Sequence, residues 1–232
     1  MKLTTLNLQG FDDWNDRHAH ISRYLHDQQP DIILFQEVVY LPEVSPFTQP
    51  QLLNQSLHYP YHQSDVSRLQ RGVDYPVYRE GLGILSRHPI VSSETIVLQQ
   101  AQGDEHNRII TLVDLFVDGQ VVKIANVHFS LTDDTDFATA HLQETLSIIG
   151  ARNEQRIIAG DFNMSDLDAV NAIWQESYIA STAVGYATFP SMDNKRIDYV
   201  LLPKEYEFDT IETSGDGLSD HRALTVSFST AT

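Results

Sequence analysis

Six strand-like apolar stretches of this chain begin or end on a carboxylate, an amide or an imidazole side chain. Such a group beside a buried strand costs several kcal/mol unless another group pairs with it. One placement of this kind is ordinary, but six indicate that the strand ends converge and that their side chains pair around a shared ligand. The side chains are Asn7, Glu37, His128, Asp161 with Asn163, Asp198, and Asp220 with His221.

The apolar patterning predicts strands that alternate with amphipathic helices in a single domain over residues 1–232. The dipeptide Asp118-Gly119 is a strong signal for a tight hairpin turn between two of the strands. Strands are expected at residues 3–8, 32–39, 82–86, 94–98, 109–117, 121–127, 156–159, 197–202 and 223–228.

Three main helices are expected between these strands. The second is expected to begin near Thr132 and Asp133, and the third to be capped at Ser165, with Asp168 in the capping-box position. The side chains expected to face the core are Trp14, His18, Ile21 and Leu25 of the first helix, Leu142, Leu146 and Ile149 of the second, and Leu167, Val170 and Trp174 of the third.

The segment from Tyr40 to Glu80 carries five prolines and is expected to be irregular, with one short helix over residues 51–57. Loops of this length in a domain are usually functional or mobile. Its aromatic and basic residues could cradle a nucleotide, or the tyrosines could pack the loop onto the domain while the arginines stay solvated. These residues are Tyr59, Tyr61, Tyr75, Tyr78, Arg68, Arg71 and Arg79.

The charge balance bears on partners. The chain has 32 acidic and 15 basic residues, a net charge of −17, whereas proteins that grip duplex DNA usually present a basic face. This favours a small-molecule substrate over nucleic acid, although a local basic rim or a divalent metal could supply positive charge. The absence of cysteine excludes disulfides and cysteine-based metal sites. No signal-peptide pattern or membrane-length apolar run is present, so a cytoplasmic protein without a membrane partner is expected.

The candidate side chains favour a hard cation. They are rich in carboxylate and amide oxygens, which suit Mg²⁺ or Mn²⁺, whereas Zn²⁺ prefers histidine or cysteine. A divalent ion would also offset repulsion among the carboxylates. His128 and His221 are then better suited to contacting a phosphate or to acid–base chemistry, with Asp198 holding His221 protonated and oriented.

Each motif taken alone also has an ordinary structural explanation. Glu37 could cap a strand, and His128 could be a satisfied core histidine. Residues 160–163, Gly-Asp-Phe-Asn, could form a turn, and residues 219–221 could cap a loop. The occurrence of all of them in one chain favours a single functional site.

The motifs TTLNLQG, DIILFQEV, GLGILSRHPI, IANVHFSL, IIAGDFN, KRIDYVLL and LSDHRAL span nearly the whole chain. In this order they resemble the endonuclease/exonuclease/phosphatase superfamily, which includes pancreatic-type deoxyribonuclease and bacterial sphingomyelinases. The resemblance implies an α/β (α+β) fold, a four-layer sandwich of two mixed β-sheets flanked by helices. It also implies a hydrolase of phosphate esters that depends on Mg²⁺ or Mn²⁺.

The resemblance implies roles for the acidic and amide residues. Glu37 corresponds to the principal metal ligand, with Asn7 nearby and Asp220 completing the metal site. Asp161 resembles the carboxylate that orients or deprotonates the attacking water. Asn163 resembles the amide that holds a phosphate oxygen or that water.

The resemblance also implies roles for the basic residues. His221 resembles the histidine that stabilises the pentacovalent phosphate, and Asp198 the partner that orients it. His128 matches a position that contacts the scissile phosphate. Arg108, within HNRIITLVDL, resembles a phosphate-contacting arginine of some branches, although a surface charge is an equally ordinary explanation.

Three functions remain open from the sequence. The preferred one is hydrolysis of a small phosphodiester or phosphomonoester. The second is a nuclease acting on DNA or RNA, which a basic strip beside the site would favour. The third is a catalytically silent binding module, which is disfavoured because every expected polar position is filled.

Overall fold

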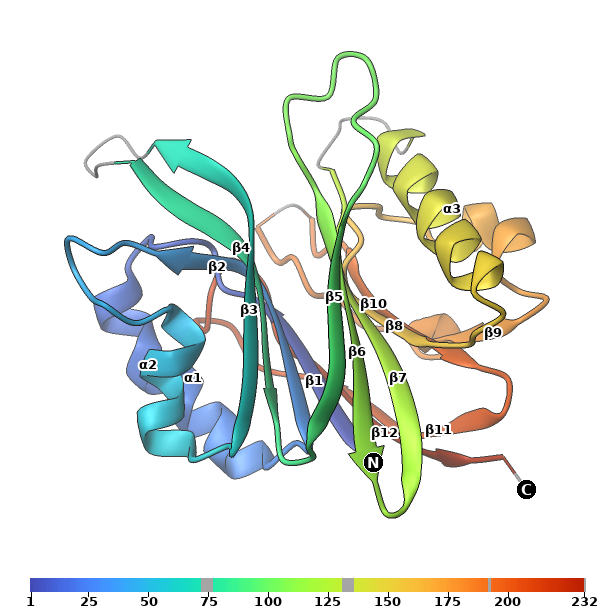
Figure 1. The fold of residues 1–232 in the computed structure, drawn as a ribbon, viewed down its shortest axis with the longest axis horizontal. Helices are drawn as coiled ribbons and strands as arrows, with labels where there is room; N and C mark the ends of the chain where they lie inside the picture. The colour runs from blue at the N-terminus through green and yellow to red at the C-terminus, as the bar shows by residue number, and fades with distance from the viewer. Residues whose placement is uncertain (72–76, 131–135, 192, 232) are drawn as a thin grey trace.

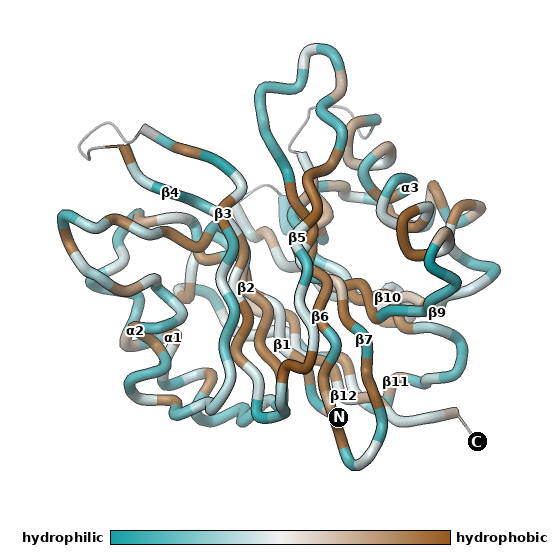
Figure 2. Tube along the Cα trace, in the orientation of Figure 1, coloured by the Kyte–Doolittle hydropathy of each residue, from teal (hydrophilic) through white to brown (hydrophobic). Residues whose placement is uncertain are grey.

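Two six-stranded mixed sheets pack face to face in the computed structural model, which describes residues 1–71, 77–130, 136–191 and 193–231. Helices α1 (Trp14–Gln28) and α2 (Gln49–Leu57) cover the outer face of one sheet, and α3 (Asp136–Ala151) covers the outer face of the other (Figure 1). Hydrophobic residues follow the strands, and hydrophilic ones the outer loops (Figure 2). The expected four-layer sandwich is confirmed.

Each sheet contains one parallel strand pair, and its other neighbours are antiparallel. The first sheet has the order β11 (Tyr206–Thr213), β12 (Leu224–Thr230), β1 (Lys2–Asn7), β2 (Ile32–Tyr40), β4 (Val77–Ser86) and β3 (Tyr61–Arg71). The second has the order β5 (Ile90–Val97), β6 (Ile109–Val117), β7 (Gln120–His128), β8 (Ile157–Asp161), β10 (Asp198–Pro203) and β9 (Tyr178–Ala180).

The parallel pairs are β1 with β2 and β7 with β8, and each is joined by a helical crossover, α1 or α3. A parallel connection needs such a crossover because the chain must return to the starting edge before it can run in the same direction. The carboxyl ends of all four strands therefore reach one edge of the sandwich. The antiparallel strands β10 and β12 begin at that same edge.

The central strands are buried on both faces, as their nearly continuous apolar sequences predict. In β2, Ile32 and Leu34 point between the sheets, whereas Ile33 and Phe35 point toward α1 and α2. This alternation follows from the two-residue period of a strand. It divides the apolar core into a layer between the sheets and one layer under the helices of each face.

A polar network crosses the middle layer of this apolar core. The amide nitrogen of Gln36 on β2 donates to the side-chain oxygen of Asn126 on β7 (2.8 Å) and to the hydroxyl of Thr5 on β1 (3.0 Å). Asn126 in turn donates to the carbonyls of Phe35 and Gly83 in the opposite sheet. The network is fully buried, so these bonds fix one alignment of the two sheets.

The segment from Tyr40 to Glu80 is not irregular as expected. It contains α2, close to the predicted short helix, and the long strand β3, which pairs with β4 to form a hairpin. The prolines lie outside β3, and Thr48 with Gln51 forms a capping box at the start of α2. Tyr59 is buried, as the packing alternative predicts, whereas Tyr75 lies outside the described residues.

Several other local predictions need correction. Strands β3, β9 and β11 were not expected, and β3 and β11 are polar edge strands that pair on one side only. His18 is exposed on α1, and Arg17 is buried in its place. The start of α3 at Thr132 and Asp133 lies outside the described residues, and its Leu142 and Ile149 are buried as predicted.

The third helix is a 3₁₀ helix, η1 (Asp168–Ile173), without the predicted capping box at Ser165. Asp166 accepts a hydrogen bond from the backbone of Ala169, so the chain turns one residue later. Leu167 and Trp174 are buried as expected, whereas Val170 is half-buried. The Asp118-Gly119 hairpin is confirmed, with positive φ at both residues. In the described part of the chain, no helix has the length and apolar character to cross a membrane.

Candidate active site

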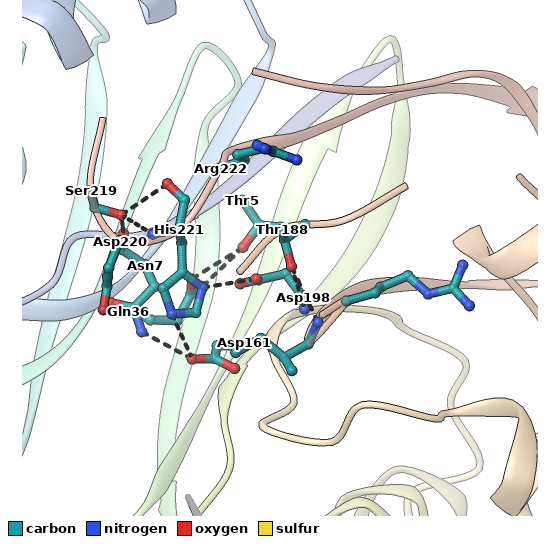
Figure 3. Close-up of polar contacts among 12 residues, drawn as sticks. Thr5, Asn7, Gln36, Asp161, Thr188, Asp198, Ser219, Asp220, His221 and Arg222 are labelled. Atoms are coloured by element: carbon teal, nitrogen blue, oxygen red, sulfur yellow. Dashed lines mark hydrogen bonds and ion pairs between the residues drawn. The ribbon is translucent and has the colours of Figure 1, made fainter. Parts of the chain in front are cut away.

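The strand topology brings the predicted polar residues to one edge of the sandwich. Parallel strands deliver their carboxyl ends there and antiparallel strands their beginnings, so distant segments of the chain meet (Figure 3). The carboxyl ends of β1, β7 and β8 contribute Asn7, His128 and Asp161, and β2 contributes Glu37 from within the strand. Asp198 begins β10, the Asp220-His221 pair precedes β12, and Asn163 follows β8.

A β-bulge directs the Glu37 side chain. Gln36 and Glu37 together face one residue of β4, because the register shifts between Phe35 and Val38, and Glu37 has φ of 52°. Bulges of this kind bend a strand and turn a side chain away from its regular position. Glu37 thereby accepts a hydrogen bond from the Asn7 amide nitrogen at 3.2 Å instead of entering the regular alternation.

Asp161 occupies the centre of the site and is buried. One carboxylate oxygen accepts from the Asn7 amide (2.9 Å) and lies 3.5 Å from His128 Nε2 and 3.8 Å from His221 Nε2. Its other oxygen accepts from the backbone N–H of Asn163. Gly160 permits this placement, because a Cβ there would lie 2.0 Å from the backbone oxygen of Val127 in β7.

His221 is held by Asp198 in a buried pair. His221 Nδ1 lies 2.8 Å from the Asp198 carboxylate, and the Phe189 ring lies 4.9 Å from the imidazole between centroids. Burial opposes protonation, but the charges of Asp198, Asp161 and Asp220 together raise the pKa of His221 to about 10. The imidazole is therefore a cation at neutral pH, with its Nε2–H directed toward Asp161.

The carboxylates of the site lie in surroundings that disfavour their negative charge. Burial and the charge of Asp198 raise the pKa of Asp161 to about 7. Burial also raises the pKa of Glu37, with Glu80 adding to it, and the pKa of Asp220. A bound cation would reduce the repulsion among these carboxylates. In addition, Asp220 Oδ1 is buried and has no hydrogen-bond partner among the described residues. The donor set therefore fits a hard divalent metal.

Two sets of candidate ligands are present at the site. Asp161, Asp198 and His221 each offer an atom within 4.8 Å of the others. In this set, His221 Nδ1 and the Asp198 carboxylate already pair with each other at 2.8 Å, which orients the imidazole. We therefore favour Glu37, Asn7 and Asp220, the ligand set predicted from the sequence.

Arg108 is buried in the site and is not a surface charge, with 4% of its area exposed. Its Nη1 lies 3.0 and 3.1 Å from the two ring nitrogens of His128, and its Nε has no partner among the described residues. Burial and the neighbouring Arg68 lower the pKa of Arg108 to about 10. Burial and the same two arginines keep the pKa of His128 well below its ordinary value, so His128 is neutral.

The sequence did not single out the residues that hold the site loops. Gln9 accepts from the backbone N–H of Asp220 (3.0 Å), and the Ser219 hydroxyl donates to the Asn7 carbonyl (2.7 Å). The buried Arg17 donates to the carbonyls of Leu8 and Leu218, which lie beside these segments. A basic residue on the apolar face of α1 is the one sequence signal that could have identified Arg17.

Asn163 is placed beside Asp161, but its amide is already engaged. Its Nδ2 donates to the carbonyl of Phe129 at 2.9 Å, and its backbone has φ of 50°. The residue therefore closes the turn that orients Asp161. The structure brings together all nine residues that were predicted for the site, Arg108 included.

A two-sheet sandwich with convergent carboxylates, amides and histidines at one edge is the architecture of a hydrolase family that acts on phosphate esters. The chain matches the profile of the Endonuclease/Exonuclease/phosphatase family over residues 4–221, and it belongs to that family. A search of curated proteins gave no match.

Solved structures share the fold at low sequence identity. An endonuclease/exonuclease/phosphatase family protein from Leptotrichia buccalis is 20% identical, with a TM-score of 0.79 over 99% of each chain. The human Nocturnin catalytic domain is 19% identical, with a TM-score of 0.75 over 100% of this chain and 94% of that one. Sphingomyelinase C from Streptomyces griseocarneus is 21% identical, with a TM-score of 0.69 over 97% of this chain and 98% of that one.

Proposed function

We propose that the chain hydrolyses a small phosphodiester or phosphomonoester by in-line attack of water on phosphorus. The observation that carries this is the placement of Asp161 within 3.8 Å of His221 Nε2 and 3.5 Å of His128 Nε2, with Arg108 against His128. A carboxylate beside a cationic imidazole and a guanidinium offers a proton acceptor and anion-binding groups at one point.

The metal in this proposal is Mg²⁺ or Mn²⁺, held by Glu37, Asn7 and Asp220. When bound, it would supply positive charge that polarises the phosphate and offsets the negative charge of the transition state. The unpaired Asp220 Oδ1 and the raised pKa values of Glu37 and Asp220 support this assignment.

The chain's own residues carry the proton and charge chemistry. Asp161 accepts a proton from the attacking water, for which a pKa near 7 is well matched at neutral pH. The new P–O bond forms as the ester P–O bond opposite breaks, and negative charge grows on the phosphate oxygens. His221, oriented by Asp198, stabilises that charge from one side, and Arg108 with His128 does so from the other.

The charge of the whole chain supports a small substrate over a nucleic acid. A net charge of −17 repels a long polyanion, whereas a single phosphate group can be bound by a few local cations. A membrane partner does not enter the proposal.

The test is a panel of substrates assayed with Mg²⁺ and with Mn²⁺: p-nitrophenyl phosphate, bis(p-nitrophenyl) phosphate, plasmid DNA and single-stranded oligonucleotides. We expect hydrolysis of a small ester that excess EDTA abolishes and added Mg²⁺ or Mn²⁺ restores. Cleavage of nucleic acid alone would replace the proposed substrate class with a nuclease. Full activity in excess chelator would remove the metal from the proposal.

A further inference from the structure

One side-chain contact joins the two sheets beside the site. Arg68 on β3 places its Nη1 2.6 Å from Nδ1 of His106, which lies in the segment between β5 and β6. Arg68 also pairs with Glu80 of β4 at 2.7 Å, and both side chains are largely buried, at 12% and 4% exposed. The Arg68–His106 bridge therefore links the β3–β4 hairpin of one sheet to a loop of the other.

Other contacts hold the partners of the bridge in place. The backbone N–H of His106 donates to Asp104, whose other carboxylate oxygen accepts from the buried Ser130 hydroxyl. Burial, Arg108 and Arg68 lower the pKa of His106, which leaves Nδ1 unprotonated to accept from a guanidinium that can only donate. Both partners are thus fixed before any ligand arrives.

The strand register places the bridge beyond the site, on its open side. Glu80 pairs with Val39 in β2 and with Arg68 in β3, whereas the Glu37 bulge lies opposite Leu82, between the pairs formed by Gly81 and Gly83. Arg68 and Glu80 thus lie farther out along the strands than Glu37. In Figure 1 the β3–β4 hairpin and the loop after β5 both extend past the ends of the central strands.

The sheet order places the bridge at one end of the site. β3 and β5 are the edge strands on the same side of the sandwich. The site residues lie on or beside β1, β2, β7, β8, β10 and β12 farther along, except Arg108, which precedes β6. A polymer with an internal phosphate at the site must leave it in two directions. On the side toward β3 and β5, the Arg68–His106 contact joins the two sheets in its path.

We propose that the Arg68–His106 bridge determines specificity by size: it stops a polymer from continuing past the site toward β3 and β5. The enzyme then accepts small phosphate esters, or the end of a chain, and rejects internal phosphodiesters. This proposal rests on the proposed function, and it specifies the substrate class: a phosphate ester in which the group on at least one side of the phosphate is short. Arg68 and His106 act by occupying space and are not catalytic residues.

The test compares a closed single-stranded DNA circle with the linear strand of the same sequence, beside bis(p-nitrophenyl) phosphate. His106→Ala removes the bridge and leaves the Arg68–Glu80 pair intact. His106→Gln keeps a side-chain oxygen that can accept from Arg68, and His20→Ala, at an exposed position on α1, is the matched control. Hydrolysis is measured with Mg²⁺, and binding by fluorescence anisotropy with Ca²⁺.

We expect His106→Ala to increase binding or cleavage of the circle relative to the linear strand by about tenfold, with His106→Gln and His20→Ala close to wild type. Hydrolysis of the small ester should stay within about threefold of wild type in all three variants. Equal and measurable binding of the circle and the linear strand by the wild-type chain would overturn the proposal. So would a His106→Ala variant that neither binds nor cuts the circle.

The two proposals fail in different ways. A wild-type chain that hydrolyses no small ester contradicts the proposed function, while the circle-to-linear ratio in the binding assay still reports on the bridge. A chain that hydrolyses small esters but shows no change in that ratio on His106→Ala contradicts the bridge alone.

Discussion

The acidic and the basic sides of the site are built differently. The acidic side comes from central parallel strands, with Asn7 and Asp161 at strand ends and Glu37 at the bulge in β2. The basic side is formed by Arg108, directly before β6, and it is flanked by Arg68 of the edge hairpin, which lies beyond the site. On the acidic side, burial and like charges raise carboxylate pKa values, and on the basic side, burial and like charges lower the pKa of Arg108 to about 10.

The two sides are therefore stabilised by ligands of opposite charge. A group of buried carboxylates is stabilised by a cation, and a buried guanidinium without a carboxylate partner is stabilised by an anion. A metal ion bound to the carboxylates and a phosphate bound between that metal and Arg108 would satisfy both requirements, as the proposed function expects. Substitutions that act on one side only should therefore separate chemistry from substrate binding.

The largest effect is expected on the acidic side. Asp161→Asn removes the proton acceptor, and His221→Ala removes the cation beside it, so each should lower kcat by about 10²–10⁴-fold. Steady-state kinetics on bis(p-nitrophenyl) phosphate with saturating Mg²⁺ measures this, with Asp166→Asn, at an exposed position, as the control. A loss below about tenfold in both variants would mean that neither residue takes part in the chemical step.

The next largest effect is expected in the free energy of unfolding when Arg68 is replaced. Arg68→Met leaves the buried Glu80 carboxylate without its ion-pair partner, which should lower the free energy of unfolding by about 3–5 kcal/mol. Urea denaturation measures the change. The double variant Arg68→Met with Glu80→Leu should recover most of the loss, since no buried charge remains. A single variant as stable as the wild type would show that Glu80 finds another partner.

Arg108→Gln should affect function without this loss of stability. Arg108 has no ion-pair partner among the described residues, so its removal leaves no buried carboxylate unpaired. Loss of a charged hydrogen bond to phosphate costs about 1.5–3 kcal/mol, which lowers kcat/KM by about 10–100-fold. Arg79→Gln, at an exposed position on β4, is the matched control and should leave kcat/KM unchanged. Equal kcat/KM for the two variants would exclude a phosphate contact by Arg108.

The smallest effect concerns pH and the loop that carries the basic side. His141 on α3 accepts from the Ser130 N–H through Nδ1 and lies 3.1 Å from the Gln99 carbonyl through Nε2, so it is neutral in the folded chain. Burial lowers its pKa below the ordinary value of 6.5. The unfolded chain therefore takes up the proton first, and stability is full above pH 6.5 and lost as the pH falls below it.

The free energy of unfolding should fall by up to about 1.4 kcal/mol per pH unit for each such histidine. His128 and His106 contribute in the same direction. The raised pKa values of Asp161 and Glu37 act in the opposite direction, so the expected effect is a difference between variants. Between pH 7 and pH 5, His141→Gln should lose less stability than the wild type in chemical denaturation. Identical slopes for wild type and variant would mean that His141 keeps its ordinary pKa in the folded chain.

The sequence predicted the acidic side better than the basic side for a physical reason. Asn7, Glu37 and Asp161 stand at the ends of long apolar runs, and strand periodicity makes such runs easy to recognise. Arg68 lies in the polar edge strand β3, whose sequence YHQSDVSRLQR has no apolar face to indicate a strand. Its pairing with Glu80 and its contact with His106 depend on tertiary structure alone.

Local irregularities of the backbone also could not be predicted from the sequence. Nothing in the run IILFQEVVY signals that a bulge turns Glu37 aside, because the extra residue is defined only by its pairing with β4. The order Ser165 to Asp168 fits a capping box, yet Asp166 accepts the hydrogen bond. Ser165 and Asp166 are adjacent residues that can both cap a helix, and spacing alone does not rank them.

The Gln36–Asn126–Thr5 network has a consequence for how precisely the site can be assembled. An apolar interface between two sheets would tolerate small translations, because one apolar contact can replace another at little cost in free energy. Directional bonds at 2.8 and 3.0 Å do not tolerate such a slide. The residue next to Gln36 in the chain is Glu37, and Asn126 precedes His128 by two positions. A side-chain amide in the dry interior thus sets the separation between a metal-ligand candidate and a phosphate-binding candidate that belong to different sheets.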